Sequence, residues 1–241
     1  MNLNDRSQAE PDNNTPTVIK THTEKLAETT SGSYITDVEK RVILKADDLS
    51  GKHGVALEIG CEGGRWSLLL ANLGWDMICT DINPHTLAIC QTRLPRAQCI
   101  LVNARDRTLP CESESVGLLL CIEVNEVISS EWFISEASRV LQDGGLLVGT
   151  VTNRLSLRGY FRRLLRGVSD DSSYTVTYPI WRSKLRGQGF KMVYQEGICW
   201  FPFARASNSP FVPIFTRIEH CVGLRRLQNL SPIIVFLAQK A

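Results

Sequence analysis

Short apolar runs alternate with amphipathic segments through the middle of the chain. The segments between the runs carry apolar residues at helical spacing, as at 64–74 and at 84–94, where Pro84 suits a first helical turn. Strands that are apolar throughout and are joined through helices are typical of a parallel sheet covered on both faces. The pattern therefore predicts an α/β fold. The predicted strands are the runs at 54–59, 75–80, 97–102, 115–124 and 146–151.

The N-terminal part of the chain differs from this middle part. Residues 1–32 are polar and lack apolar periodicity, which predicts a flexible N-terminal tail in front of one domain at 33–241. Val38, Val42 and Ile43 share one face at helical spacing, so an amphipathic helix is expected across the entrance of the domain.

The last third of the chain adds two further predicted strands, at 191–200 and 231–240. About 30 residues separate them, far more than a hairpin connection needs. The segment at 200–228 is therefore interpreted as a functional insertion. The basic segment at 153–178 is a second candidate lid over a pocket.

Composition adds few constraints. Apolar residues make up 43% of the chain and charged residues 22%, and the net charge of +2 gives no indication of a nucleic-acid partner. The polar N-terminus lacks the apolar core of a secretory signal, so a cytoplasmic location is expected. The eight cysteines include no C-x-x-C pair and the four histidines show no metal-ligand spacing. We therefore expect reduced core thiols and no metal site.

A glycine-rich turn at 60–65, with the sequence GCEGGR, joins the first predicted strand to a helix. Such a turn places free backbone N–H groups and a helix N-terminus around a pocket at the carboxyl edge of the sheet. Asp81 ends the next strand, 21 residues after Gly60. An acid at about that distance binds ribose hydroxyls in dinucleotide-type folds. The turn and the acid together predict a nucleoside-containing ligand.

Two ligand classes fit this arrangement: a nicotinamide or flavin dinucleotide, and S-adenosylmethionine (SAM). Glu58 and Glu62 would repel a pyrophosphate, whereas the sulfonium and ammonium groups of SAM tolerate or favour nearby carboxylates. The dinucleotide fingerprint G-x-G-x-x-G is also absent, because position 62 is Glu and position 65 is Arg. SAM is favoured, and a Rossmann-type nicotinamide oxidoreductase is the alternative.

Five segments resemble, in order, the motifs of class I SAM-dependent methyltransferases of the small-molecule type. ALEIGCEGGRWS resembles the first motif, E/D-x-G-x-G-x-G, and CTDIN, VNARDRTLP, LLLCIEVNEVI and EASRVLQDGGLLVGTVTN resemble the later ones. The resemblance covers about residues 35–199. It implies a Rossmann-like, doubly wound sheet of seven strands, mostly parallel, with 231–240 as an antiparallel final strand. It also implies SAM as the cofactor.

The resemblance implies roles for single residues. Glu58 would meet the methionine ammonium, Asp81 would bind the ribose diol and Ile82 would pack on adenine. Asn103 and Ala104 would contact the adenine edge. Cys121 and Glu123 would face the transferred methyl, with Glu123 as the candidate catalytic base. The expected cofactor-binding residues are Glu58, Gly60, Cys61, Gly64, Asp81, Ile82, Asn103, Ala104 and Cys121.

Two departures from the family pattern bear on function. Glu62 stands at the usual middle glycine and is expected to point away from the close-approach position or toward the ligand's ammonium. Val127 stands where many members have His, which removes a His-based catalytic role. Methyl transfer needs little acid–base help, because alignment of nucleophile, methyl and sulfur provides much of the acceleration.

The variable segments indicate the acceptor only by class. The stretch at 154–166 sets leucines and aromatics among arginines, which suits either a pocket lid or contact with an anionic membrane surface at the inner face. The insertion is rich in aromatics and proline, which suits an apolar acceptor. We expect a small, partly apolar acceptor, such as a quinone precursor, a lipid-linked sugar or a secondary metabolite. A non-catalytic SAM-binding module is a further alternative, and the oligomeric state is not indicated.

Overall fold

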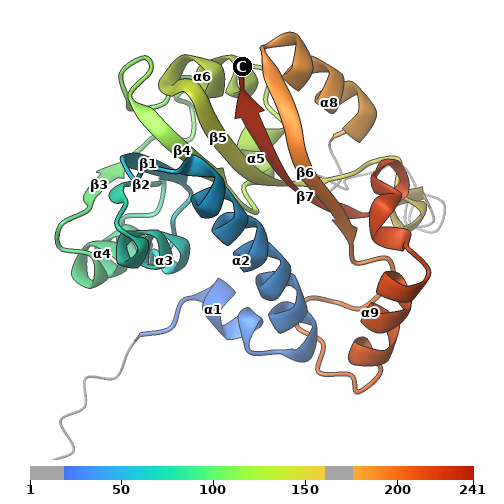
Figure 1. The fold of residues 1–241 in the computed structure, drawn as a ribbon. Coiled ribbons are helices and arrows are strands. Elements are labelled where there is room, and N and C mark those ends of the chain that lie inside the picture. Colours follow the sequence, from blue (N-terminus) through green and yellow to red (C-terminus); the bar gives the residue numbers. More distant parts are fainter. Residues whose placement is uncertain (1–18, 161–175) are drawn as a thin grey trace, which may run out of the picture.

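The computed structural model of the chain describes residues 19–160 and 176–241. Its centre is a seven-stranded sheet in the order β3-β2-β1-β4-β5-β7-β6, shown in Figure 1. Strands β1 to β5 pair in parallel, and β7 runs antiparallel to both β5 and β6. The expected sheet and its antiparallel final strand are confirmed. The strands are β1 Val55–Ile59, β2 Asp76–Asp81, β3 Gln98–Leu101, β4 Val116–Cys121, β5 Leu141–Thr152, β6 Phe190–Ile198 and β7 Ile233–Lys240.

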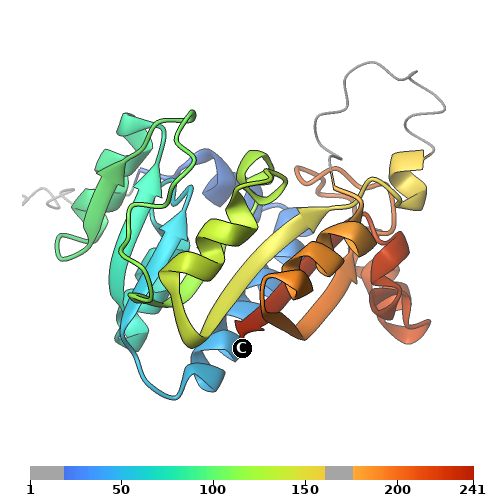
Figure 2. The same cartoon turned by 90° about the horizontal axis from the view of Figure 1, so that it is seen from above.

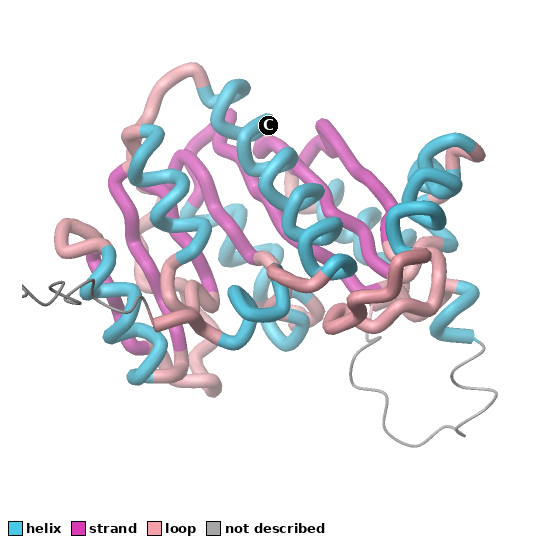
Figure 3. Tube along the Cα trace, turned by 90° about the horizontal axis from the view of Figure 1, so that it is seen from below, coloured by secondary structure: helices cyan, strands magenta, loops and turns pink. Residues whose placement is uncertain are grey.

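Helices cover both faces of the sheet, as the views from above and below show (Figures 2 and 3). One core cluster packs α2, α3 and α4 against the sheet, and a second packs α5, α6 and α8 against the opposite face. This is the doubly wound arrangement that the sequence predicts. These helices are α2 Thr30–Ser50, α3 Arg65–Leu73, α4 Pro84–Arg93, α5 Asn125–Ile128, α6 Phe133–Val140 and α8 Tyr178–Gly187.

Strand β4 shows why the central strands are apolar throughout. Leu118 and Leu120 belong to the first core cluster, whereas Leu119 and Cys121 belong to the second. Successive side chains of a strand point to opposite faces, so both faces of β4 are buried beneath helices.

The long helix α2 lies across the sheet, as expected from its apolar face. Val38, Val42 and Ile43 are buried against the strands. The Thr29 hydroxyl caps the helix by accepting a hydrogen bond from the Gly32 N–H at 3.0 Å. The helix ends at Gly51, whose φ of 64° is left-handed.

The segment before α2 is more ordered than the sequence predicts. Of the expected tail, residues 1–18 lie outside the described residues, but α1 (His22–Ala27) and the first turn of α2 are helical. In Figure 1, α1 lies beside the N-terminal end of α2. Polar contacts hold it: the Glu24 carboxylate accepts from the Thr21 N–H at 2.8 Å and from the Arg93 guanidinium at 2.7 Å. Apolar periodicity cannot reveal such a segment.

The predicted insertion at 200–228 is folded onto α2. It contains α9 (Val212–Cys221) and the short 3₁₀ helix η1 (Leu224–Arg226), with η2 (Gln228–Leu230) at its end. Glu219 of α9 is buried and accepts hydrogen bonds from the Tyr34 hydroxyl at 2.8 Å and from the Trp200 N–H at 2.9 Å. The second predicted lid, 153–178, lies partly outside the described residues.

No helix in the described ranges has the length and apolar character needed to cross a bilayer.

Shortening a core side chain of α2 tests the packing described above. We expect Ile43→Ala, at a fully buried position, to lower the free energy of unfolding by about 2–5 kcal/mol, through lost burial and a residual cavity. Leu49→Ala on the same helix is the control, because Leu49 is 49% exposed, and a change of roughly 0.5 kcal/mol or less is expected. Urea unfolding measures both. Equal losses would contradict the assigned burial of α2.

Candidate functional site

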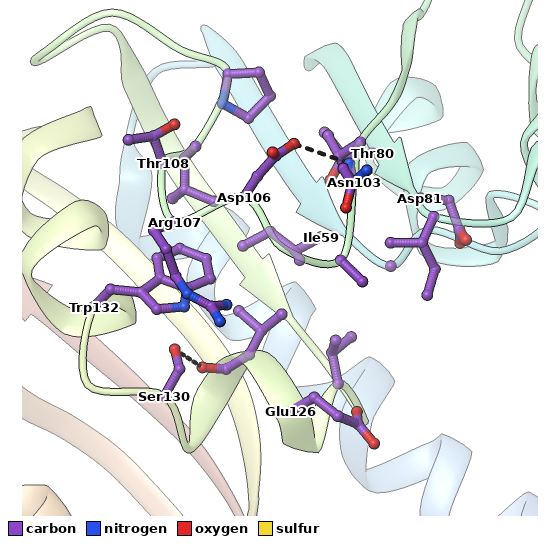
Figure 4. A pocket seen from close by; sticks show the side chains of 18 of the residues that line it. Ile59, Thr80, Asp81, Asn103, Asp106, Arg107, Thr108, Glu126, Ser130 and Trp132 are labelled. Atoms are coloured by element: carbon purple, nitrogen blue, oxygen red, sulfur yellow. Dashed lines mark hydrogen bonds between the residues drawn. The ribbon is translucent and has the colours of Figure 1, made fainter.

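Two adjoining cavities lie at the carboxyl ends of β1, β2 and β4. The larger, of about 630 Å³, is bounded by the loops that follow β3 and β4 and is shown in Figure 4. The smaller, of about 260 Å³, lies at the glycine turn. Gly60, Asp81 and Val124 line both cavities. The shared residues make one elongated site that suits a ligand with two chemically different ends.

The backbone of the turn requires glycine at two of the expected positions. Gly60 has a φ of 67°, and a Cβ there would lie 2.6 Å from Cγ2 of Val124. Gly64 has a φ of 76°, and a Cβ there would lie 2.6 Å from Sγ of Cys90. Any side chain at these positions would be strained and would collide with a neighbour. Gly60 therefore allows the closest backbone approach to both cavities.

Glu62 takes the left-handed conformation of the missing glycine, with a φ of 50°. Its carboxylate points to the N-terminal segment, where it accepts from the Thr21 hydroxyl at 2.9 Å, from the Thr23 N–H at 3.3 Å and from the Thr23 hydroxyl. A carboxylate at the start of α1 is also favoured by the exposed N–H groups of the helix. The Glu62 side chain therefore points away from the close-approach position, which is the first of the two orientations expected for it. Its contacts hold α1 over the glycine turn. Neither threonine was singled out by the sequence.

Asp81 connects the glycine turn to the end of β2. Its Oδ2 accepts from the Glu62 N–H at 2.7 Å, and its Oδ1 accepts from the Asn83 N–H at 2.8 Å. The residue is 8% exposed and borders both cavities. An ionised carboxylate has about four acceptor sites, so each oxygen retains one for a ligand hydroxyl.

The larger cavity collects the residues that the sequence assigned to adenine. Ile82 borders it and is 61% exposed, which leaves a free apolar face. Asn103 and Ala104 border it from the loop after β3, and the Asn103 side chain accepts from the Arg105 N–H at 2.9 Å. In Figure 4, Trp132 lies on the side of the cavity opposite Asp81. Trp132 carries no motif, and the sequence analysis missed it.

Glu58 is a buried acid beside the smaller cavity. It is 4% exposed, and its carboxyl receives a hydrogen bond from the Ser67 hydroxyl. Burial raises the pKa of Glu58 to about 8, against the opposing effect of the Ser67 bond. Near pH 7 the isolated protein therefore holds this carboxyl mainly in its neutral form.

The two residues expected at the transferred methyl take different places. Glu123 borders the smaller cavity, and its carboxylate forms an ion pair with Nη1 of Arg205 from the insertion. Its backbone N–H donates to the Thr150 hydroxyl at 2.6 Å. Cys121 is fully buried in the core on the α5 and α6 face and lines neither cavity. The alternation of β4 turns its thiol away from the site.

Cys61 lines the smaller cavity from the glycine turn, and three further thiols meet in the core behind it. The sulfurs of Cys79, Cys90 and Cys99, from β2, α4 and β3, lie within 4.8 Å of one another. All eight cysteines are free. A metal would require thiolates. Burial raises the pKa of the Cys99 thiol, whereas hydrogen bonds from Cys61 and Cys90 lower the pKa of the Cys79 thiol to about 3. We interpret the group as core packing, and the absence of a metal site stays a prediction.

Comparison with known families identifies the central part of the chain. The family model described as a methyltransferase domain matches residues 57–149. The matched stretch contains the glycine turn, Asp81, the loop with Asn103, and Glu123.

Two curated proteins are similar to part of the chain. An uncharacterized methyltransferase-like protein of Schizosaccharomyces pombe is 27% identical over 156 residues, which cover 63% of this chain and 58% of that protein. A probable phthiotriol/phenolphthiotriol dimycocerosates methyltransferase of Mycobacterium ulcerans is 37% identical over 103 residues, which cover 41% of this chain and 38% of that protein. The chain thus matches little more than half of the first relative and less than half of the second.

Among solved structures, the geranyl diphosphate C-methyltransferase of Streptomyces coelicolor, in complex with Mg²⁺, geranyl diphosphate and S-adenosyl-L-homocysteine, has a similar fold. Its TM-score is 0.57 at 11% identity, with 88% of this chain and 81% of that chain covered. The matched family model, the curated relatives, the strand order and the glycine turn with its acid lead to one conclusion: residues 57–149 form a methyltransferase domain of the class I SAM-dependent type.

Proposed function

We propose that the protein binds SAM across the two cavities and transfers its methyl group directly, in line, to a small and partly apolar acceptor. The observation that carries the proposal is the pair of adjoining cavities that share Gly60, Asp81 and Val124. Adenosine would occupy the larger cavity and the methionine part the smaller one.

The larger cavity offers the contacts that adenosine needs. Asp81 retains acceptor capacity on both oxygens, which suits two ribose hydroxyls. The exposed face of Ile82 suits a flat apolar base, and Asn103 and Ala104 lie where they can contact its edge.

The smaller cavity favours a cationic ligand end. Glu58, Glu62 and Glu123 border it, and Arg65 is the basic residue among its described lining residues. The acids suit the sulfonium and ammonium groups, and Arg65 suits the methionine carboxylate. A pyrophosphate would meet the same acids unfavourably, which argues against a nicotinamide cofactor.

When bound, SAM supplies a methyl group already activated by the positive sulfur. The protein would contribute alignment of the acceptor and exclusion of water. The Glu123 carboxylate is engaged by Arg205, and an ion-paired carboxylate is a weak base. We therefore assign Glu123 to the positioning of groups at the cavity rather than to proton transfer.

The insertion supports an acceptor with an apolar part. The ring of Phe215 packs 4.4 Å from that of Phe201 and 5.6 Å from that of Phe203, measured between centroids. Contact of 154–166 with a membrane stays a prediction, and part of that stretch lies outside the described residues. Within it, Leu155 and Leu157 are about half exposed. A cytoplasmic location also stays a prediction.

Calorimetric titration with SAM, S-adenosylhomocysteine and NADH tests the ligand class. We expect the first two to bind and NADH not to bind. Binding of NADH alone would overturn the proposal in favour of an oxidoreductase. Binding of SAM without turnover on a panel of apolar acceptors, each assayed with isotopically labelled methyl, would favour a non-catalytic binding module.

Substitution of Asp81 tests the ribose contact. We expect Asp81→Ala to weaken SAM binding by about 1–3 kcal/mol, the scale for losing a charged hydrogen-bond partner. Asp76→Ala, at the exposed opposite end of β2, is the matched control and should leave the affinity unchanged. Calorimetry gives both affinities, and thermal melting confirms that the variants fold. An unchanged affinity in Asp81→Ala would remove this carboxylate from the site.

The raised pKa of Glu58 leads to the prediction that SAM binding releases a proton. Burial raises the pKa of Glu58 to about 8, so at pH 6.5 the free protein holds the neutral carboxyl. A cationic ligand favours the carboxylate and lowers its pKa, so binding at pH 6.5 should release up to one proton. Calorimetry in two buffers of different ionisation enthalpy counts the protons. Glu58→Gln cannot release one, and equal proton counts in both proteins would show that Glu58 does not sense the ligand.

A further inference from the structure

Arg205 reaches from the insertion to the central site. It lies in the loop between β6 and α9, and its Nη1 pairs with Glu123 just after β4. The backbone of this loop is fixed by the start of α2: the Arg205 carbonyl accepts from the Thr29 hydroxyl at 2.6 Å, and the Ser207 carbonyl accepts from the Ser31 N–H at 3.0 Å. Arg205 is therefore held at its backbone and at Nη1 of its guanidinium.

The opposite edge of this guanidinium is unused. Nε and Nη2 of Arg205 are buried and have no hydrogen-bond partner among the described residues. The side chain is 19% exposed. Buried donors without partners are rare in folded proteins, because each has lost its hydrogen bonds to water. Nε and Nη2 form the edge of arginine that binds a carboxylate or phosphate through two parallel hydrogen bonds.

Several acids and one further base lie around Arg205. Glu39 of α2 is fully buried, lies 3.5 Å from Nη2 of Arg65 without hydrogen-bond geometry, and attracts Arg205 electrostatically. Three acids, Glu39, Glu62 and Glu123, thus act on Arg205, and Arg65 is the second base of the group. The indole N–H groups of Trp66 and Trp200 are also buried and have no partner within the described ranges. None of the three acids makes a hydrogen bond to Nε or Nη2 of Arg205, so this edge keeps two donors for an oxyanion.

We propose that the Nε–Nη2 edge of Arg205 binds an anionic group of the methyl acceptor, a carboxylate or a phosphate, and so selects acceptors that carry one beside their apolar part. The proposal rests on the proposed function, because it assigns the acceptor end of the same site. Glu123 is then a positioning residue, since its pairing with Nη1 orients the opposite edge of the guanidinium.

Two observations assign Arg205 to the acceptor rather than to the methionine carboxylate. Arg65 borders the smaller cavity directly, whereas Arg205 is not among its described lining residues. Arg205 also belongs to the insertion that carries the aromatic cluster of Phe201, Phe203 and Phe215. An anion at Arg205 with an apolar body on these rings places both parts of an acceptor on one segment.

Fluorinated fragments test the proposal on the full-length protein saturated with S-adenosylhomocysteine. The probes are 4-fluorobenzoate, 4-fluorophenyl phosphate and the neutral 4-fluorobenzamide, and ¹⁹F NMR titration gives each affinity. We expect at least one of the two anions to bind at least tenfold more tightly than the amide. The order of the two anion affinities shows whether the Nε–Nη2 edge of Arg205 prefers a carboxylate or a phosphate.

Variants locate the anion. Arg205→Gln should reduce the affinity of the preferred anion to that of the amide, and Arg205→Lys should retain part of it, because lysine keeps the charge but loses the two-pronged edge. Arg217→Gln, an exposed arginine on α9, makes the same change in net charge and should have no effect. Anion binding that survives Arg205→Gln, or equal binding of acid and amide by the wild type, would overturn the proposal.

The cofactor affinity separates this proposal from the one on which it rests. We expect S-adenosylhomocysteine to bind Arg205→Gln within twofold of the wild type. A large loss in that variant would assign Arg205 to the methionine carboxylate and overturn the acceptor assignment, with SAM binding itself retained in the wild type. If the wild type binds no S-adenosylhomocysteine, the proposed function fails instead. Arg205→Lys, with melting as the check of folding, keeps the test valid if Arg205→Gln is unstable.

Discussion

The hydrogen bond from the Glu62 N–H to the Asp81 carboxylate joins the two halves of the site, and the rest of the binding region depends on it. At 2.7 Å it ties the left-handed glycine turn after β1 to the end of β2. Strand pairing alone stops before these ends, because the β1–β2 register runs only to Ile59 and Thr80. The carboxylate is thereby fixed where both cavities meet, before any ligand arrives. A group that is already oriented loses less conformational freedom on binding, so this hydrogen bond favours the ribose contact proposed for Asp81.

The left-handed backbone of Glu62 also directs its side chain toward the N-terminal segment. Its carboxylate holds Thr21 and Thr23 of the N-terminal segment, and the start of α2 in turn holds the loop that carries Arg205. Polar contacts and the short helix α1 therefore connect the glycine turn to the loop that carries Arg205. A glycine at position 62 would keep the turn and lose the first of these contacts. The departure from the family pattern is thus explained by the segment that covers the turn rather than by the ligand.

Much of the fold could be predicted because the central strands are buried on both faces and the helices are amphipathic, so residues such as Leu118 and Val42 identify their elements by pattern. The larger cavity could be predicted for a related reason: the carboxyl ends of parallel strands meet at one edge, which brings Asp81 and Asn103 together. Contacts made by polar side chains between distant segments follow no period. Glu62 with Thr21, and Arg205 with Glu123, are separated by 41 and 82 positions, and no spacing rule links them. Cys121 was expected at the site but lies in the core on the α5 and α6 face. Successive residues of a strand point to opposite faces, so an error of one position is enough to place a side chain on the wrong face.

The charged group at Arg205 shows how an open guanidinium edge can persist in a folded protein. Burying one unpaired charge costs several kcal/mol, but Glu39, Glu62 and Glu123 attract Arg205 and offset that cost. Burial lowers the pKa of Arg205, and attraction by Glu39 opposes that effect, so the guanidinium keeps its charge. Burial also raises the pKa of Glu39 to about 7. An incoming oxyanion would add one negative charge, and Glu39 lies close enough to its neutral form at physiological pH to accept a proton in response. Proton uptake at Glu39 would then leave the net charge of the cluster unchanged, whereas a neutral acceptor would leave the two donors of Arg205 unsatisfied.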